Sequence, residues 1–218
     1  MENIKGAIFD MDGTLIDSLI VWNEIWDTVG EKYGKNGFRP TAEDDKATRT
    51  MTLAACCDFI HEKYGFGQNG NELLCLMNDV CSEFYADRVE MKKGAAAFLD
   101  YLKEKGVKMI IATATAMDLV NIAYKRCGLD KYFDTILSCA DIGKGKDQPD
   151  IFLHALEKLG TQLNETWVFE DSATAVVTAS KAGFHTVGIY DDFNYGQDIL
   201  QSTADFYIAK GESLEKLI

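Results

Sequence analysis

The sequence predicts an α/β fold, in which a parallel sheet carries helices on both faces and a helical segment is inserted after the first strand. Two observations lead to this prediction. Short apolar runs rich in Ile, Val and Phe alternate with longer segments of helical periodicity, which is typical of parallel strands joined by helices. This alternation stops between residues 17 and 90, where helical patterns follow one another without a convincing strand.

Five apolar runs are expected to form the sheet, and a sixth is a candidate edge strand. The five runs are residues 4–10, 107–113, 134–138, 166–170 and 186–190, and the edge candidate is 205–208. Helices are expected between them at 94–105, 117–127, 149–160 and 172–182. Pro149 suits the first turn of a helix, whereas Gly128, Gly160 and Gly183 suit positions just beyond helix ends.

The segment 17–90 is expected to form a separate helical domain. Its helical stretches are 18–34, 42–64 and 70–88, with the turn-like sequences GKNG and GFGQNG between them. Residues 1–16 and 91–218 would then form the α/β domain together. A chain of 218 residues is long enough to bury a sizeable core and to carry one insertion.

Composition and charge exclude several classes of function. With a formal net charge of −13, the protein lacks the positive electrostatic potential that binding to a nucleic-acid backbone or an anionic membrane requires. A small phosphorylated ligand needs only local positive charge and is therefore not excluded. The sequence shows no signal peptide and no apolar run long enough to span a bilayer, and its six cysteines form no C-x-x-C pair. We therefore expect a cytoplasmic protein with reduced thiols, whose oligomeric state stays open.

Chemically active side chains follow the ends of four predicted strands. They are Asp10 and Asp12 after the first strand, Thr113 at the end of the second, Lys144 and Lys146 in the loop after the third, and Glu170 and Asp171 at the end of the fourth. Because the carboxyl ends of parallel strands meet at one edge of a sheet, these side chains are expected to lie close together.

Several carboxylates at one edge repel each other unless a cation neutralises them. Mg²⁺ prefers oxygen ligands, commonly one or two carboxylates together with water and a phosphate. A magnesium ion between Asp10 and Asp171 would offset the repulsion and attract a phosphate. Thr113 and Lys146 would complete the binding site for that phosphate. Asp10 would then be placed to attack phosphorus and form an aspartyl-phosphate, leaving Asp12 for proton transfer.

Each of these residues also has a purely structural explanation. Asp-Gly after a strand commonly forms a turn, and the two lysines could be solvated loop charges. Glu170, Asp171 and Ser172 could simply cap the following helix. The occurrence of all four groups in this order at four strand ends favours a functional site.

The same residues resemble the motifs of the haloacid dehalogenase-like superfamily, in the subfamily with a helical cap after the first motif, and the resemblance covers essentially the whole chain. The first motif, D-x-D-G-T-hydrophobic-x-D, is present in full from Asp10 to Asp17. Thr113 matches the second motif, a Ser or Thr that ends an apolar strand. The acidic pair in E-D-S matches the fourth motif.

The third motif, a lysine before a Pro-Asp pair and a helix, is present with one departure. In KDQPDIF the residue after Lys146 is Asp147, where the family usually has proline. Lys144 lies close by, so both lysines are candidates, and the spacing to Pro149 favours Lys146.

The resemblance implies a Rossmann-like core with an α-helical cap and assigns a role to each motif residue. Asp10 would be the nucleophile and a magnesium ligand, and Asp12 would be the general acid and base, with its backbone carbonyl toward the metal. Thr113 and Lys146 would bind the phosphate. Asp171 and Glu170 would provide the remaining acidic contacts to the metal. Asp12 favours phosphoryl transfer, because the family's dehalogenases lack this second acid. The expected reaction is hydrolysis of a small phosphomonoester metabolite, whose identity the sequence does not reveal.

Three alternatives stay open at this point. A sugar phosphomutase of the β-phosphoglucomutase type would use a cap arginine, here Arg49, to hold a second phosphate, although an exposed charge at a helix end is the favoured explanation of Arg49. A phosphonatase would use a cap lysine, and none of the cap lysines is marked for that role. A catalytically silent phospho-ligand binding protein of the same fold is the most remote alternative.

Overall fold

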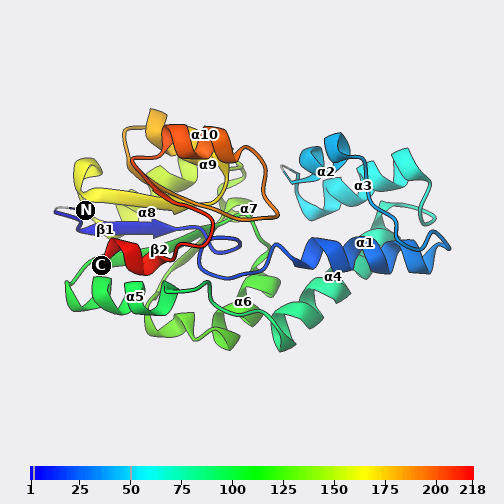
Figure 1. Cartoon of the computed structure of the whole chain (residues 1–218), viewed down its shortest axis with the longest axis horizontal. Helices are drawn as coiled ribbons and strands as arrows, with labels where there is room; N and C mark the ends of the chain where they lie inside the picture. The colour runs from blue at the N-terminus through cyan, green and yellow to red at the C-terminus, as the bar shows by residue number, and fades with distance from the viewer. Residues whose placement is uncertain (2, 50) are drawn as a thin grey trace. The chain divides into compact units, whose positions relative to one another are not determined.

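The computed structural model describes residues 1, 3–49 and 51–218, which form two compact units. We call Met1–Leu19 together with Val89–Ile218 the sheet unit, and Ile20–Arg88 the helical unit. The helical unit lies within the expected insertion, 17–90, and its described residues include helices but no strand (Figure 1). Each unit is described by itself below.

The sheet unit is built on six parallel strands, which confirms the predicted α/β class. The strands are β1 (Gly6–Phe9), β2 (Lys108–Thr113), β3 (Ile136–Ser138), β4 (Thr166–Glu170), β5 (His185–Ile189) and β6 (Phe206–Ile208). Their order across the sheet is β3-β2-β1-β4-β5-β6, and every neighbouring pair is parallel. All six apolar runs expected from the sequence therefore contain a strand, including the edge candidate 205–208.

Helices cover both faces of this sheet (Figure 1). They are α5 (Ala95–Glu104), α6 (Met117–Arg126), α7 (Cys139–Ile142), α8 (Asp150–Leu159), α9 (Ala173–Lys181) and α10 (Gln197–Thr203), with 3₁₀ turns at Leu129–Lys131, Leu163–Glu165 and Leu214–Leu217. The expected helices 94–105, 117–127, 149–160 and 172–182 correspond to α5, α6, α8 and α9. Gly128, Gly160 and Gly183 follow helix ends with positive φ, as predicted.

Alternating side chains of the central strand β1 fill the two halves of the core. Ile8 packs with buried residues of α8 and α9, among them Phe152. Phe9 points to the opposite face, where its ring stacks on Phe169 at 4.3 Å between centroids and meets the edge of Phe98 on α5. Each large side chain buried in this way contributes about 1.5–3 kcal/mol of hydrophobic free energy. Burial on both faces explains why β1 is a continuous apolar run.

The described residues of the helical unit form four helices. They are α1 (Val21–Lys32), α2 (Ala42–Thr48), α3 (Leu53–Tyr64) and α4 (Gly70–Asp87). The expectation of one helical stretch over 42–64 is wrong, because α2 ends at Thr48 and α3 begins at Leu53. The side chain of Thr52 accepts a hydrogen bond from the N–H of Ala55 at 3.2 Å, and this N-cap starts a separate helix.

The six cysteines are free thiols, as predicted, and four of them are buried. Cys56 and Cys57 lie in the core of the helical unit, where the sulfur of Cys57 contacts the sulfur of Met77 at 3.5 Å. Burial raises the pKa of both Cys56 and Cys57 to about 12, so these thiols are unreactive. None of the helices in the described part of the chain combines the length and the apolar content needed to cross a bilayer.

Candidate active site

The carboxyl ends of β1 and β4 bring three carboxylates together. The two strands are neighbours with Phe9 opposite Phe169, and the N–H of Asp10 donates to the carbonyl oxygen of Phe169 at 3.0 Å. Asp10 therefore lies beside Glu170 and Asp171, and one carboxylate oxygen from each of the three lies within 4.8 Å of the others. The side chains are buried, with exposed fractions of 8%, 1% and 3%. We call these three residues the carboxylate cluster.

Lys146 provides positive charge at the cluster. Its ammonium group donates to Oδ1 of Asp10 and, at 2.5 Å, to Oε1 of Glu170. Lys144 instead pairs with Asp150 at 2.6 Å, and its side chain is 53% exposed, against 11% for Lys146. Of the two lysines that the sequence left as candidates, the structure brings Lys146 to the carboxylates and leaves Lys144 near the surface.

Burial first, and then repulsion between neighbouring carboxylates, raises the pKa of Asp10 and Asp171. Burial raises the pKa of the Asp10 carboxyl well above its usual range, against the opposing charge of Lys146. The neighbouring carboxylates of Glu170 and Asp171 raise that pKa further. Burial and then the charges of Glu170 and Asp191 raise the pKa of Asp171 to about 7. Burial alone would lower the pKa of Lys146, but Asp10 and Glu170 hold it above its ordinary value.

The donor set of the cluster suits a hard divalent cation. Three carboxylates face one ammonium group, so the ionised cluster carries more negative than positive charge. Oxygen ligands at this density are the kind that Mg²⁺ takes in proteins. The residues present therefore fit the cation that the sequence predicts.

Two hydrogen bonds and the close approach of Gly13 fix the carboxylate of Asp171. The hydroxyl of Thr14 donates to Oδ1 at 3.2 Å, and the side-chain amide of Asn194 donates to Oδ2 at 2.7 Å. Gly13 has a φ of +81°, and a Cβ built there would lie 2.3 Å from Oδ2 of Asp171. Glycine is therefore required at position 13 both for the turn and for this close approach. Asn194 was not predicted to belong to the site. It lies in the loop after β5, and a search of that strand's carboxyl end for polar side chains would have found it.

Asp12 points its carboxylate to two hydroxyl groups and is not a member of the carboxylate cluster. The hydroxyl of Ser18 donates to Oδ1 and that of Thr115 donates to Oδ2, both at 2.7 Å. Thr113 is buried, and its hydroxyl oxygen accepts the N–H of Thr115 at 3.0 Å. The loop after β2 therefore places Thr115 at Asp12, and Ser18 is a contact that the sequence did not predict.

Arg49 lies in the helical unit, at the end of α2. Its guanidinium donates to Oδ2 of Asp45 at 3.1 Å and lies over the ring of Trp22, 4.5 Å from the centroid. Asp45 also accepts the indole N–H of Trp26 at 3.1 Å. The side chain of Arg49 is largely buried, so the alternative of an exposed helix-end charge is wrong. A role in substrate binding stays a prediction.

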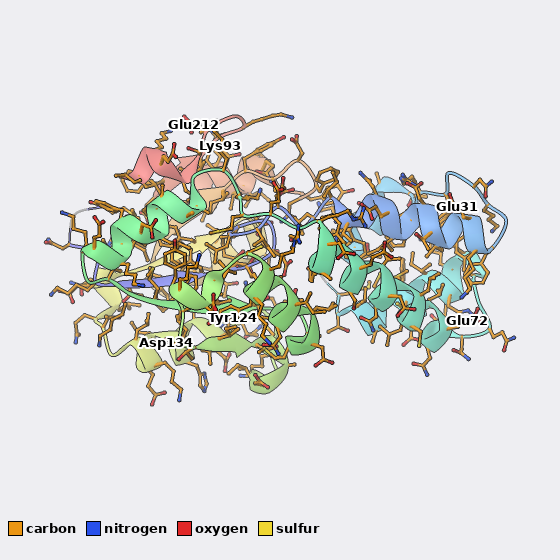
Figure 2. All side chains as sticks on the ribbon, turned by 90° about the horizontal axis from the view of Figure 1, so that it is seen from below. Glu31, Glu72, Lys93, Tyr124, Asp134 and Glu212 are labelled. Carbon is orange, nitrogen blue, oxygen red and sulfur yellow. The ribbon has the colours of Figure 1, made fainter. Side chains whose placement is uncertain are left out.

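A cavity of about 300 Å³ in the sheet unit lies beside the loop after β5. Its lining includes Lys92, Asp191 and Phe193, together with Lys93 and Glu212, which lie near each other in Figure 2. The lining does not include the three clustered carboxylates, so we assign the chemistry to the cluster and not to this cavity.

Comparisons with known proteins concern the chain as a whole. Residues 4–183 match the haloacid dehalogenase-like hydrolase family. A phosphorylated carbohydrates phosphatase of Thermotoga maritima is 26% identical over 216 residues, which is 98% of each chain. A Thermotoga maritima crystal structure provisionally named beta-phosphoglucomutase has a TM-score of 0.79 at 26% identity, again over 98% of each chain. CbbY from Rhodobacter sphaeroides, solved in complex with phosphate, has a TM-score of 0.78 at 18% identity over 94% of this chain and 93% of its own, and this likeness shows the fold alone.

Proposed function

The chain belongs to the haloacid dehalogenase-like hydrolase family, and from this premise we propose that it is a Mg²⁺-dependent phosphatase that hydrolyses a small phosphomonoester. One observation carries the proposal. The ends of β1 and β4 hold Asp10, Glu170 and Asp171 within 4.8 Å of one another, with Lys146 hydrogen-bonded to two of them. A buried cluster of this charge suits a divalent cation and the phosphate that the cation attracts.

The three clustered carboxylates, with the backbone carbonyl of Asp12, would hold Mg²⁺, which when bound neutralises them and stabilises negative charge on the phosphoryl oxygens. A carboxylate oxygen of Asp10 attacks phosphorus, and the bond from phosphorus to the ester oxygen breaks. Asp12 gives its proton to that departing oxygen. Asp12, now a carboxylate, takes a proton from the water that hydrolyses the aspartyl-phosphate, so that phosphate leaves and both acids are restored.

Lys146 and Thr113 would bind the transferring phosphoryl group. The ammonium of Lys146 already lies at Asp10, where negative charge on the phosphoryl oxygens would develop. Thr113 ends β2, the strand next to β1, so its hydroxyl belongs to the same edge of the sheet. Thr115 and Ser18 hold Asp12 through its two oxygens and would keep this acid oriented between the two proton transfers.

Phosphorylated carbohydrates are the proposed substrate class. The support is the name of the Thermotoga relative, which matches along nearly the whole of both chains. A phosphomutase has weaker support. It would need a cap group for a second phosphate, and Arg49, the proposed candidate, packs on Trp22 and hydrogen-bonds to Asp45 within the helical unit.

The proposal is tested by measuring inorganic phosphate release from p-nitrophenyl phosphate and from a panel of sugar phosphates, with Mg²⁺ and with EDTA. Turnover that needs Mg²⁺ is the expected result. Absence of phosphate release across the panel in Mg²⁺ would overturn the enzyme assignment. Conversion of β-glucose 1-phosphate to glucose 6-phosphate in the presence of a bisphosphate activator, without phosphate release, would establish the phosphomutase instead.

A further inference from the structure

The loop after β5 is fixed by contacts to the carboxylate and the backbone of Asp191. The ammonium of Lys92 donates to Oδ2 of this buried carboxylate at 2.6 Å, and the N–H of Phe193 donates to Oδ1 at 2.8 Å. The side-chain amide of Gln197, on α10, donates to the carbonyl oxygen of Asp191 at 3.2 Å. An ion pair and two hydrogen bonds therefore hold the loop from both ends.

This fixed loop aims the side chain of Asn194 at Asp171. The amide nitrogen of Asn194 donates to Oδ2 of Asp171 at 2.7 Å and also lies 3.2 Å from its backbone carbonyl oxygen. The orientation of the amide follows from its other contact, because its oxygen accepts the N–H of Tyr195 at 2.9 Å. The nitrogen must therefore face Asp171.

We propose that Asn194 is a positioning residue that fixes the rotation of the Asp171 carboxylate for the divalent cation, and this inference rests on the proposed Mg²⁺-dependent function. By holding a side-chain oxygen and the backbone oxygen of Asp171 together, the amide orders this ligand before the cation binds. Residues that orient metal ligands in this way typically account for about 10–100-fold in metal affinity.

A neutral amide is suited to this position for an electrostatic reason. Lys146 already supplies one positive charge to the cluster, and a second ammonium at Asp171 would compete with a cation for the same carboxylate. The amide of Asn194 donates a hydrogen bond without adding charge, so it orders Asp171 and leaves its negative charge available.

The competing explanation is that Asn194 only anchors its loop. The two explanations differ for Gln197, whose side chain donates to the carbonyl oxygen of Asp191 in the same loop and accepts a hydrogen bond from the hydroxyl of Tyr207. If loop anchoring is all that matters, Gln197→Ala and Asn194→Leu weaken cation binding alike. If Asn194 positions Asp171, only the variants at position 194 do so.

The experiment is titration calorimetry of the intact chain with Mg²⁺ alone, without substrate. Asn194→Leu keeps the branched shape of the side chain and removes the donor, and Asn194→Ala serves as a second variant if the first does not fold. We expect Mg²⁺ affinity to fall by about 10-fold or more in either, with little change in Gln197→Ala. Asn164→Ala, a change of the same kind at an exposed asparagine, is expected to leave the affinity unchanged.

The outcomes separate this inference from the function on which it rests. Wild-type affinity in both variants at position 194, or an equal loss in Gln197→Ala, overturns the role of Asn194 and leaves the magnesium site intact. Failure of the wild-type protein to bind Mg²⁺ overturns the magnesium site, and the inference with it. The rise in melting temperature at saturating Mg²⁺ gives a second readout, expected to be smaller in Asn194→Leu than in Gln197→Ala.

Discussion

Gly13 and Asp171 approach so closely that a Cβ atom on Gly13 would lie 2.3 Å from the carboxylate oxygen Oδ2 of Asp171. A Gly13→Ala substitution must therefore move Asp171, and it also places alanine at a φ of +81°. We expect Mg²⁺ affinity to fall by at least about 10-fold, measured by calorimetry, because the ligand is displaced. Strain at this φ adds a loss of about 1–3 kcal/mol in the free energy of unfolding.

Gly106→Ala is the matched control for that change. Gly106 has a φ of +70° in the same unit, and a Cβ there would meet no atom within 4 Å. This variant is expected to share the loss of stability in urea unfolding and to keep wild-type Mg²⁺ affinity. Equal Mg²⁺ affinities in the two variants would refute displacement of Asp171.

Asp10→Asn removes the proposed nucleophile and one of the three clustered charges. We expect phosphate release to fall by at least about a thousandfold. The melting temperature in EDTA should stay the same or rise, because the amide relieves repulsion with Glu170 and Asp171. Asp17→Asn changes an exposed aspartate of the same motif and should leave turnover within about twofold. Activity retained in Asp10→Asn would refute the assigned nucleophile.

Lys146→Ala leaves the clustered carboxylates without their ammonium partner. We expect a loss of at least about a hundredfold in turnover, because the phosphoryl group loses its cationic contact. The free energy of unfolding in EDTA should fall by about 3 kcal/mol, because a buried ion pair is broken on one side. Lys144→Ala breaks an exposed pair and should match the wild type in both assays. The reverse ranking of the two variants would reassign the phosphate-binding lysine.

Stability without metal should depend on pH through Asp171. Its pKa is raised from an ordinary 3.8 to about 7, so between these values the folded protein holds a proton that the unfolded chain has released. The free energy of unfolding in EDTA should therefore decrease as pH rises from about 4 to about 7. Melting temperatures measured at pH 5, 6 and 7 test this trend.

Two changes should flatten that dependence. Saturating Mg²⁺ would compensate the ionised carboxylates, and Asp171→Asn removes one of the two cluster carboxyls whose raised pKa produces it. A melting temperature in EDTA that rises across this pH range would show that Asp171 is not held in a protonated form.

The sheet was predictable because each strand is a short apolar run bounded by polar or turn-forming residues. α7 and α10 were not, because Cys139–Ile142 and Gln197–Thr203 are too short to show helical periodicity. The break between α2 and α3 was missed for a related reason. The residues around it continue a helical pattern, and the N-cap at Thr52 depends on one hydrogen bond.

The clustering of Asp10, Glu170 and Asp171 was predictable from topology alone, because parallel strands end at a common edge. The spacing to Pro149 favoured Lys146 over Lys144, but both are in one loop and only its folded path decides which lysine reaches the cluster. Ser18 and Asn194 were missed because each contact is made by a loop whose course is set by tertiary packing.

The position of β1 between β2 and β4 governs when the site can exist during synthesis. Gly6 pairs with Lys108 on one side and with Thr166 on the other, so both partners leave the ribosome long after β1 itself. The helical unit, whose contacts fall within Ile20–Arg88, can form earlier in translation because its contacts are closer in sequence. The nascent chain therefore carries Asp10 for most of its synthesis without the partner carboxylates, and the carboxylate cluster completes only when β4 joins the sheet.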